Sequence, residues 1–436
     1  MKSLYRIVRF APDTRSALFA PLALALATSA CGGSVSASPQ QSGTMGQTVS
    51  DAASGDDASP GGGSGDDAAA EASPPAGSII TVPLEECTPL VYKAGVVVGA
   101  QTFQLIIDTG STTLGVASSK CTDCGVTPLY TPGAMAVDQM TMANSQYGSG
   151  SWTGEVYQDS VGFASDPTVP LKFAAITTQT NFFGPMMCEA GGGYQGIMGL
   201  DRAKSELPGT NAFFDQFVSA RGIADVFATE LCDTTGTLWL GGYDAKAATG
   251  APQYTPFTTD IASSYYYTVD LESIAVAGAS APVAVASGAM FPDTVVDTGT
   301  TALVLTSGAF TSLTNDIASS PGFSKIFGSV GASWFSSQLP CGAAGTSKAD
   351  IDAALPTLTL TFGKGPGITI EMAPSESYLV PVTGYGWCAL MTTAPSGQQF
   401  PLAAILGSPF LRSQITIFDR ANSRIGFAPH TACAGG

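Results

Sequence analysis

The segment Phe103-Gln-Leu-Ile-Ile-Asp-Thr-Gly-Ser-Thr-Thr-Leu114 decides the fold, because its Asp-Thr-Gly tripeptide recurs in Thr294-Val-Val-Asp-Thr-Gly-Thr-Thr-Ala-Leu303. In both copies the aspartate, Asp108 or Asp297, follows a short apolar run. Two carboxylates held close together can share one proton, so that one acts as a base while the other acts as an acid. Hydrolysis of an amide by water requires this pair of roles. The repeat therefore predicts a site built on two carboxylates.

A second pair of matching segments indicates an internal duplication. Ile197-Met-Gly199 follows the first aspartate, and Ile405-Leu-Gly407 follows the second at a comparable distance. A single Asp-Thr-Gly would be weak support, because Asp and Gly are common in turns. Two copies with the same apolar context and the same downstream companion predict two related halves.

Most of the chain after residue 79 has the pattern of short strands. Apolar and β-branched runs such as Gly236–Gly242 and Leu355–Phe362 are separated by Gly, Pro, Asn and Ser. This pattern is typical of mostly antiparallel β structure. One helical segment at 212–218 places three phenylalanines near one face.

The composition is strongly acidic. The chain has 436 residues, with 34 acidic against 17 basic side chains and a formal net charge of −17. Phosphate binding needs clustered lysine and arginine, so we expect no nucleic-acid partner. Few basic side chains also limit repulsion when carboxylates are protonated. The composition therefore fits an acid-tolerant protein as well as an ordinary acidic exported one.

The single histidine, His430, excludes most other hydrolytic chemistry. Ser-His-Asp triads, Cys-His pairs and HExxH zinc sites all need a histidine placed beside other catalytic groups. No such motif surrounds His430 in Ala428-Pro-His-Thr-Ala-Cys433. We therefore expect an ordinary surface histidine, no catalytic metal and no cofactor.

Residues 1–31 are typical of an export signal. Basic residues precede an apolar stretch at 17–27 that is too short to span a membrane, and Thr28-Ser-Ala-Cys31 follows it. A cysteine directly after small residues resembles a bacterial lipoprotein signal, which implies that Cys31 is lipidated. The protein would then be anchored at the outer membrane or cell surface. The alternative is cleavage near Ala30 and release as a secreted or periplasmic protein.

Residues 32–78 predict a disordered tether. They are mostly Gly, Ser, Ala, Asp and Pro and contain no aromatic residue, so they cannot bury enough apolar surface to fold. No Lys or Arg occurs between Cys31 and Leu90.

Four features together resemble the pepsin-like aspartic proteases over most of residues 85–430. The two Asp-Thr-Gly segments resemble that family's catalytic loops. Tyr147-Gly-Ser-Gly-Ser-Trp-Thr-Gly154 resembles its flap, a β-hairpin that closes over the substrate. Ile405–Arg412, followed by Ile417–Pro429, resembles its C-terminal signature.

The resemblance implies a mostly β, bilobal fold, with two related β-barrel-like lobes, an interlobe sheet and an active-site cleft. The first lobe would span 79–255, with the first aspartate and the flap, and the second 256–436. It implies an aspartic endopeptidase in which a water molecule between Asp108 and Asp297 attacks peptide bonds, at acidic pH. We expect peptide or protein substrates, no cofactor, and a monomer.

The resemblance also assigns roles to residues around the two aspartates. The loop glycines allow tight turns, the Ser and Thr hydroxyls donate to the carboxylates, and the two central threonines lock the halves together. These active-site support residues are Thr109, Gly110, Ser111, Thr298, Gly299 and Thr300. The flap and substrate-binding residues are Tyr147, Gly148, Ser149, Tyr194 and Ile197.

The chain departs from the family pattern beside the flap tyrosine and in the segment before the first lobe. Gly115 stands where many pepsins have a tryptophan that braces the flap tyrosine. Trp152 either substitutes for that tryptophan or packs in the core. Pepsin zymogens also have a basic prosegment, whereas the segment before Leu90 has no basic residue, so we expect activity without a pepsinogen-like activation step.

The cysteines fit an oxidising compartment. Nine are present, and removal of Cys31 leaves an even set of eight. Cys341–Cys388 resembles the family's bridge in the C-terminal lobe, and Cys121–Cys124 stands where the first lobe has a small disulfide loop. For Cys121-x-x-Cys124, zinc binding or redox chemistry are the alternatives. We expect Cys188–Cys232 and Cys87–Cys433 for the others, and the family's interlobe sheet, in which the chain ends meet, favours the second of these pairings.

A catalytically silent binding or inhibitor protein on the same fold is the competing interpretation, since a fold does not determine function. Such relatives usually lose an aspartate, a loop glycine or the flap tyrosine. This chain keeps Asp108, Asp297, both glycines and Tyr147.

Overall fold

The computed structural model describes residues 79–430, apart from 89, 149, 165, 184–192, 203–204, 260–264, 287–288, 290–291, 364–366 and 394–401. The described residues belong to one compact unit. The predicted signal with Cys31, the predicted tether, Ser149, Cys188 and Cys433 lie outside the described residues. Predictions that fall on them stay predictions.

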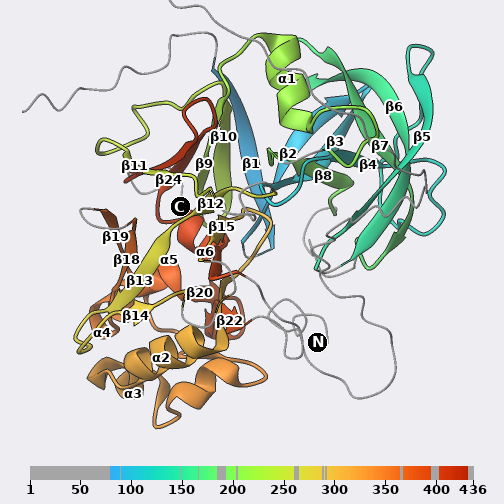
Figure 1. The fold of residues 1–436 in the computed structure, drawn as a ribbon. Coiled ribbons are helices and arrows are strands. Elements are labelled where there is room, and N and C mark those ends of the chain that lie inside the picture. The colour runs from blue at the N-terminus through green and yellow to red at the C-terminus, as the bar shows by residue number, and fades with distance from the viewer. Residues whose placement is uncertain are drawn as a thin grey trace, which may run out of the picture. The chain divides into compact units, whose positions relative to one another are not determined.

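A 13-stranded sheet runs through the first half of the chain and takes in its last two strands (Figure 1). Its order is β11-β25-β24-β9-β10-β1-β2-β3-β8-β4-β7-β6-β5. In chain order these strands are β1 (Ile80–Thr88), β2 (Val91–Val98), β3 (Gln101–Asp108), β4 (Leu114–Ala117), β5 (Val137–Gln146), β6 (Ser151–Phe163), β7 (Val169–Thr180), β8 (Gly196–Gly199), β9 (Val226–Leu231), β10 (Thr235–Leu240), β11 (Gln253–Pro256), β24 (Ile415–Asp419) and β25 (Arg424–Ala428).

Three smaller sheets make up the second half, in the orders β12-β15-β23-β16-β22, β14-β13-β18-β19 and β17-β21-β20. Their strands are β12 (Thr268–Val269), β13 (Leu271–Val276), β14 (Val283–Ala284), β15 (Thr294–Val296), β16 (Leu303–Leu305), β17 (Cys341–Gly342), β18 (Leu358–Phe362), β19 (Ile368–Met372), β20 (Leu379–Val382), β21 (Gly386–Ala389), β22 (Met391–Thr393) and β23 (Ala404–Leu406).

The strand pairings show the predicted duplication directly. In the first half β8 runs parallel to β3 and antiparallel to β4, which itself runs parallel to β7. In the second half β23 runs parallel to β15 and antiparallel to β16, which runs parallel to β22. Each Asp-Thr-Gly loop therefore connects two strands of the same four-stranded arrangement.

The end of the chain returns to the sheet of the first half. β24 pairs with β9, and β25 pairs with both β24 and β11. The buried rings of Phe227 on β9 and Phe418 on β24 stack with centroids 4.5 Å apart. These strands form the interlobe sheet that the family resemblance implied.

Helices are few and short. α1 (Phe213–Arg221) packs on β7 and β8 and buries Phe213, Phe214 and Phe217, as the sequence predicted (Figure 1). The other helices lie in the second half: α2 (Ser307–Ala318), α3 (Pro321–Phe327), the 3-10 helix η3 (Ala332–Ser336), α4 (Lys348–Ala354), α5 (Pro374–Ser377) and α6 (Ser408–Leu411). In the described part of the chain, no helix has the length and apolar character to cross a membrane.

The prediction that His430 is an ordinary surface histidine is wrong. Its side chain is only 12% exposed. Nδ1 lies 3.2 Å from Glu230 Oε1, and Nε2 lies 3.1 Å from the carbonyl oxygen of Arg412. The cause is tertiary, because β25 carries His430 back against β9.

The structure contains two of the expected disulfides, Cys121–Cys124 and Cys341–Cys388. The second joins residues that are paired between β17 and β21. Cys121, Asp123 and Cys124 are the only described residues grouped closely enough to hold a metal ion, but both sulfurs belong to the disulfide. Cys87 and Cys232 are also disulfide-bonded.

Candidate active site

Each aspartate lies at the end of a strand, and the turn that follows holds the two carboxylates in the same way. The amide of Gly110 donates to Asp108 Oδ1 at 2.9 Å, and the Ser111 hydroxyl donates to Oδ2 at 2.5 Å. In the second loop Gly299 N–H donates to Asp297 Oδ1 at 2.8 Å. The Thr300 hydroxyl donates to Asp297 Oδ2 at 2.5 Å. Both carboxylates are thereby fixed in one orientation.

The threonines of the two tripeptides connect the loops to each other. The amide of Thr109 donates to Thr298 Oγ1 and the amide of Thr298 donates to Thr109 Oγ1, both at 3.0 Å. Each hydroxyl then donates onward to the opposite strand, to the carbonyl of Val296 at 3.0 Å or of Ile107 at 3.1 Å. All four groups are buried, so this network fixes one loop against the other.

The loop glycines let the carboxylates face each other. A Cβ added to Gly110 would lie 2.9 Å from Asp297 Oδ1, and one added to Gly299 would collide with the Asp108 carboxylate. Each glycine therefore lies against the carboxylate of the opposite loop. No larger residue fits at either position while the two aspartates keep this arrangement.

The glycines of the two apolar-apolar-Gly segments allow equally close contact behind the loops. A Cβ on Gly199 would lie 2.6 Å from the carbonyl oxygen of Ser111. A Cβ on Gly407 would lie 2.6 Å from the carbonyl oxygen of Ala302. These two segments were predicted from the sequence to be a repeat. The close contact behind each loop explains why both segments end in glycine.

The environment of the two carboxyls differs. Asp108 is 5% exposed, whereas Asp297 is half-buried and Gly299 is exposed, so solvent reaches the pair from the second loop. Burial raises the pKa of Asp108 well above its usual range, and the negative charge of Asp297 raises it further. The bonds from Ser111 and Gly110 act in the opposite direction. The pair therefore keeps a proton at pH values where isolated carboxyls have lost theirs.

Tyr147 lies at the tip of the β5–β6 hairpin, where its N–H donates to the carbonyl of Gly150 at 2.7 Å. Gly148 follows in an exposed bend. Trp152 Nε1 donates to the Tyr147 hydroxyl at 3.2 Å and its side chain is buried. A Cβ on Gly115 would lie 3.5 Å from Trp152 Cζ2. Trp152 thus does both things that the sequence left as alternatives: it braces Tyr147 and it packs in the space beside Gly115.

Tyr194 and Ile197 lie in the apolar cluster on which Tyr147 packs, and they are only 2% and 5% exposed. The Tyr194 hydroxyl donates to the carbonyl of Phe182. The ring of Phe182 stacks on Tyr147 with centroids 5.4 Å apart.

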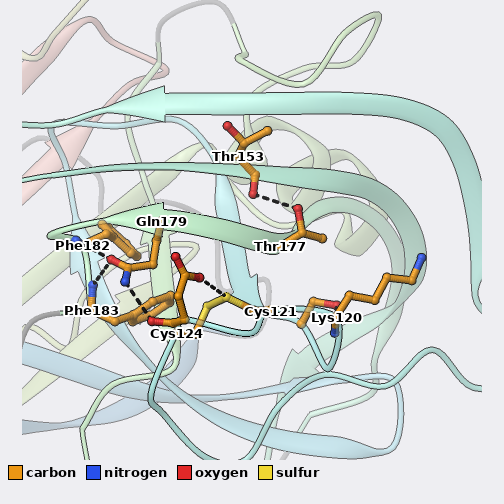
Figure 2. Close-up of a disulfide and its surroundings, with 10 residues drawn as sticks. Lys120, Cys121, Cys124, Thr153, Thr177, Gln179, Phe182 and Phe183 are labelled. Carbon is orange, nitrogen blue, oxygen red and sulfur yellow. Dashed lines mark hydrogen bonds between the residues drawn. A yellow bond between two sulfur atoms is a disulfide. The ribbon is translucent and has the colours of Figure 1, made fainter.

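Phe182 and Phe183 were not among the residues predicted from the sequence. Figure 2 shows both beside the Cys121–Cys124 disulfide, where Gln179 Oε1 accepts from their amides at 2.9 and 3.2 Å. The adjacent aromatic pair was the available signal.

A third carboxyl beside the pair was also missed. Asp201 is 1% exposed, and its amide donates to the carbonyl of Ser111 at 2.8 Å. Burial raises its pKa well above the usual range, and the charges of Asp108 and Asp297 act in the same direction. Its sequence signal was an acidic residue directly after the buried Ile197–Leu200 segment.

Known proteins resemble this chain over most of its length. A sequence model described as eukaryotic aspartyl protease matches residues 91–430. An aspartic protease of Phaffia rhodozyma is 28% identical over 351 residues, which cover 78% of this chain and 76% of the relative. A beta-secretase of Strongylocentrotus purpuratus is 28% identical over 366 residues, 77% of this chain and 65% of the relative. Pepsin A of Sus scrofa is 26% identical over 366 residues, 80% and 83% respectively.

These matches include both Asp-Thr-Gly loops, the hairpin with Tyr147 and the interlobe strands. They confirm the mostly β, bilobal pepsin-like fold and the endopeptidase activity that the sequence predicted. The chain belongs to the eukaryotic aspartyl protease family and is an aspartic-type endopeptidase.

Proposed function

We propose that Asp108 and Asp297 are the catalytic pair, and that they activate one water molecule between them for attack on a peptide bond, at acidic pH. The observation that carries this proposal is the facing geometry. Each loop glycine lies against the opposite carboxylate, and each carboxylate keeps two fixed hydrogen bonds. Two carboxyls in this arrangement share a proton over part of the acidic range.

In the first step the ionised carboxylate takes a proton from the water as its oxygen attacks the peptide carbonyl carbon. The protonated carboxyl donates its proton to the carbonyl oxygen, which gives a neutral tetrahedral intermediate. In the second step the intermediate returns a hydroxyl proton to a carboxylate, and the peptide nitrogen receives a proton as the C–N bond breaks. The pair ends with one proton, ready for the next water.

The supporting residues have distinct roles in this proposal. Ser111 and Thr300 orient the carboxylates, and Thr109 with Thr298 fixes the distance between the loops. The hairpin residues Tyr147, Gly148 and Ser149 cover the bound peptide. Ile197 and Tyr194 form the wall beneath the hairpin that sets the size of the neighbouring substrate side chain.

The decisive experiment is a digest of a peptide library across pH 2 to 7 by the wild type, Asp108→Asn and Asp297→Asn. We expect the wild type to cut best in acid and each variant to lose about ten-thousand-fold in kcat/KM, because neither role can be filled by an amide. A wild type that cuts no peptide at any pH would contradict the activity. A variant that cuts as well as the wild type would contradict the assignment of that aspartate.

We propose further that residues 1–31 direct export from a bacterial cell, that Cys31 is lipidated, and that residues 32–78 tether the lobes 79–255 and 256–436 as a monomer at the outer membrane or cell surface. The basic, apolar and small-residue regions before Cys31 support export. Mass spectrometry of the mature N-terminal peptide tests the anchor. An unmodified N-terminus beyond Cys31 would instead indicate a secreted or periplasmic form.

The pairings Cys188–Cys232 and Cys87–Cys433 are also part of the proposal. Cys87 and Cys232 are both disulfide-bonded, which supports full oxidation of the set. Peptide mapping without reduction distinguishes these pairings from Cys87–Cys188 with Cys232–Cys433.

A further inference from the structure

Glu206 lies beside the flap, although no motif marks it in the sequence. It follows β8 by seven residues, in the segment that also carries Asp201. The hydroxyl of Ser145 donates to Glu206 Oε1 at 2.7 Å. Ser145 is on β5, two residues before Tyr147, so this bond ties Glu206 to the hairpin near its tip.

The carboxylate of Glu206 lies near the reacting groups. Burial raises the pKa of Tyr147 above its usual range, and the charges of Glu206 and then Asp108 raise it further. Burial raises the pKa of Tyr266 to about 12, with contributions from Asp201, both catalytic aspartates and Glu206. Glu206 therefore shares one electrostatic environment with the flap tyrosine and with a tyrosine of the second half of the chain.

Solvent reaches Glu206 although protein surrounds most of it. The residue is exposed, yet burial among neighbouring groups is the main reason why the pKa of its carboxyl is raised. The carboxyl is therefore partly desolvated and still accessible. A substrate side chain can reach such a group.

Glu206 has no cationic partner among the described residues. The hydroxyls of Ser145 and Thr113 act on its carboxyl; both are neutral, and they offset the effect of burial on its pKa only partly. Asp419, by contrast, is paired with Arg424 at 2.7 Å and with Asn422. A partly desolvated carboxylate without a cation is stabilised when a ligand supplies one.

We propose that Glu206 is a specificity-determining residue that favours substrates with a lysine or arginine side chain next to the scissile bond. This inference rests on the proposed function of Asp108 and Asp297. Because Ser145 occupies Oε1, the substrate cation pairs with the remaining oxygen. A two-pronged arginine contact is not available, so lysine and arginine are accepted about equally.

The test compares peptides that are identical except that each position around the cut is in turn Lys, Arg, Gln or Leu. For the wild type at pH 6, one position should favour Lys and Arg over Gln by about tenfold in kcat/KM. Glu206→Gln keeps the size of the side chain and removes its charge. We expect this variant to lose the preference, which is measured as the ratio of Lys to Gln cleavage by the same enzyme. Glu371→Gln, on an exposed position of β19, is the matched control and should keep it.

The pH dependence of the preference separates a charge contact from a change in shape. The ratio of Lys to Gln cleavage cancels the titration of the catalytic pair, which is common to both peptides. Of the titratable groups that face Glu206, Tyr147 and Tyr266 stay neutral in acid, and Asp108 belongs to the cancelled pair. The ratio should therefore decline toward one as the pH is lowered and Glu206 takes up its proton.

Three results would overturn the inference. The wild type could cut Lys and Gln peptides equally at pH 6, Glu206→Gln could keep the preference, or the ratio could stay constant with pH. Each leaves the endopeptidase proposal intact, because cleavage itself is observed. A wild type that cuts none of the peptides would overturn the proposed function and this inference together.

Discussion

The two Asp-Thr-Gly loops have the same internal bonds but different surroundings. Asp108 and Asp297 each accept one amide and one hydroxyl hydrogen bond at closely similar distances. Behind Asp108, the backbone amide of the buried residue Asp201 donates to the Ser111 carbonyl. Behind Asp297, the amide that donates to the Thr300 carbonyl belongs to Ser408, whose hydroxyl donates to the Thr298 carbonyl at 3.2 Å.

The hydrogen bonds that the duplication repeats fix the local geometry of the carboxylates. Contacts outside the repeat determine how easily each carboxyl is ionised. The first loop has the flap, a third carboxyl and the deeper burial, while the second is open to solvent. Burial disfavours the charged form of a carboxyl. We therefore expect the shared proton to reside mainly on Asp108 when no substrate is bound.

The strongest test of the symmetry is removal of one threonine hydroxyl at a time. Thr109→Val and Thr298→Val each delete two hydrogen bonds of the buried network and leave an amide and a carbonyl without partners. The expected loss is about 2–4 kcal/mol in the free energy of unfolding for either variant. Denaturant unfolding measures it.

The double variant deletes all four bonds, and a loss smaller than the two single losses added together would show that the two pairs of bonds depend on each other. Losses that differ by more than about 2 kcal/mol between the single variants would show that the loops do not share the network equally.

The next prediction concerns the asymmetry. Because Asp201 has a raised pKa in the folded protein, the unfolded chain loses this proton first as the pH rises. The folded state then binds more protons than the unfolded state, so stability falls with rising pH, by at most about 1.4 kcal/mol per pH unit for this group. Asp201→Asn removes that contribution and should flatten the fall between pH 4 and 7.

Ser408→Ala, at the corresponding place in the second loop, is the matched control. It should leave the slope of stability against pH unchanged, because a hydroxyl does not titrate in this range. Asp108 has a shift of the same sign and keeps part of the slope in both variants. An Asp201→Asn profile that runs parallel to the wild type would mean that Asp201 is ionised in the folded protein.

The sequence was enough to predict the features that the duplication repeats. Asp108, Thr109 and their counterparts were identifiable because the same short pattern occurs twice, and its bonds are mostly local or related by symmetry. Such a pattern determines its local geometry, because a tight Asp-Thr-Gly turn places the amide and hydroxyl donors around its own carboxylate.

The features outside the repeat depend on contacts between distant segments. Asp201 lies behind Ser111, and Glu206 lies beside the flap, only because β8 runs parallel to β3 and directs the segment that follows it. His430 was wrongly predicted to lie at the surface for the same reason, since its partners come from β9 and from the carbonyl of Arg412. No local pattern encodes these neighbours.

Trp152 belongs to the flap hairpin of the first half and packs beside Gly115, which lies on the strand that follows the first Asp-Thr-Gly loop. It marks the smallest and most specific difference between the two halves. Trp152→Phe removes the N–H that donates to the Tyr147 hydroxyl and keeps an aromatic ring in the buried space. We expect kcat/KM to fall by about tenfold, equivalent to about 1.4 kcal/mol, from the lost positioning of Tyr147. If the indole only fills space, the loss should appear in unfolding experiments and leave kcat/KM of the folded enzyme unchanged. Adding Gly115→Trp to Trp152→Phe separates these cases further, because an indole placed at position 115 restores activity only if its N–H can reach the tyrosine hydroxyl.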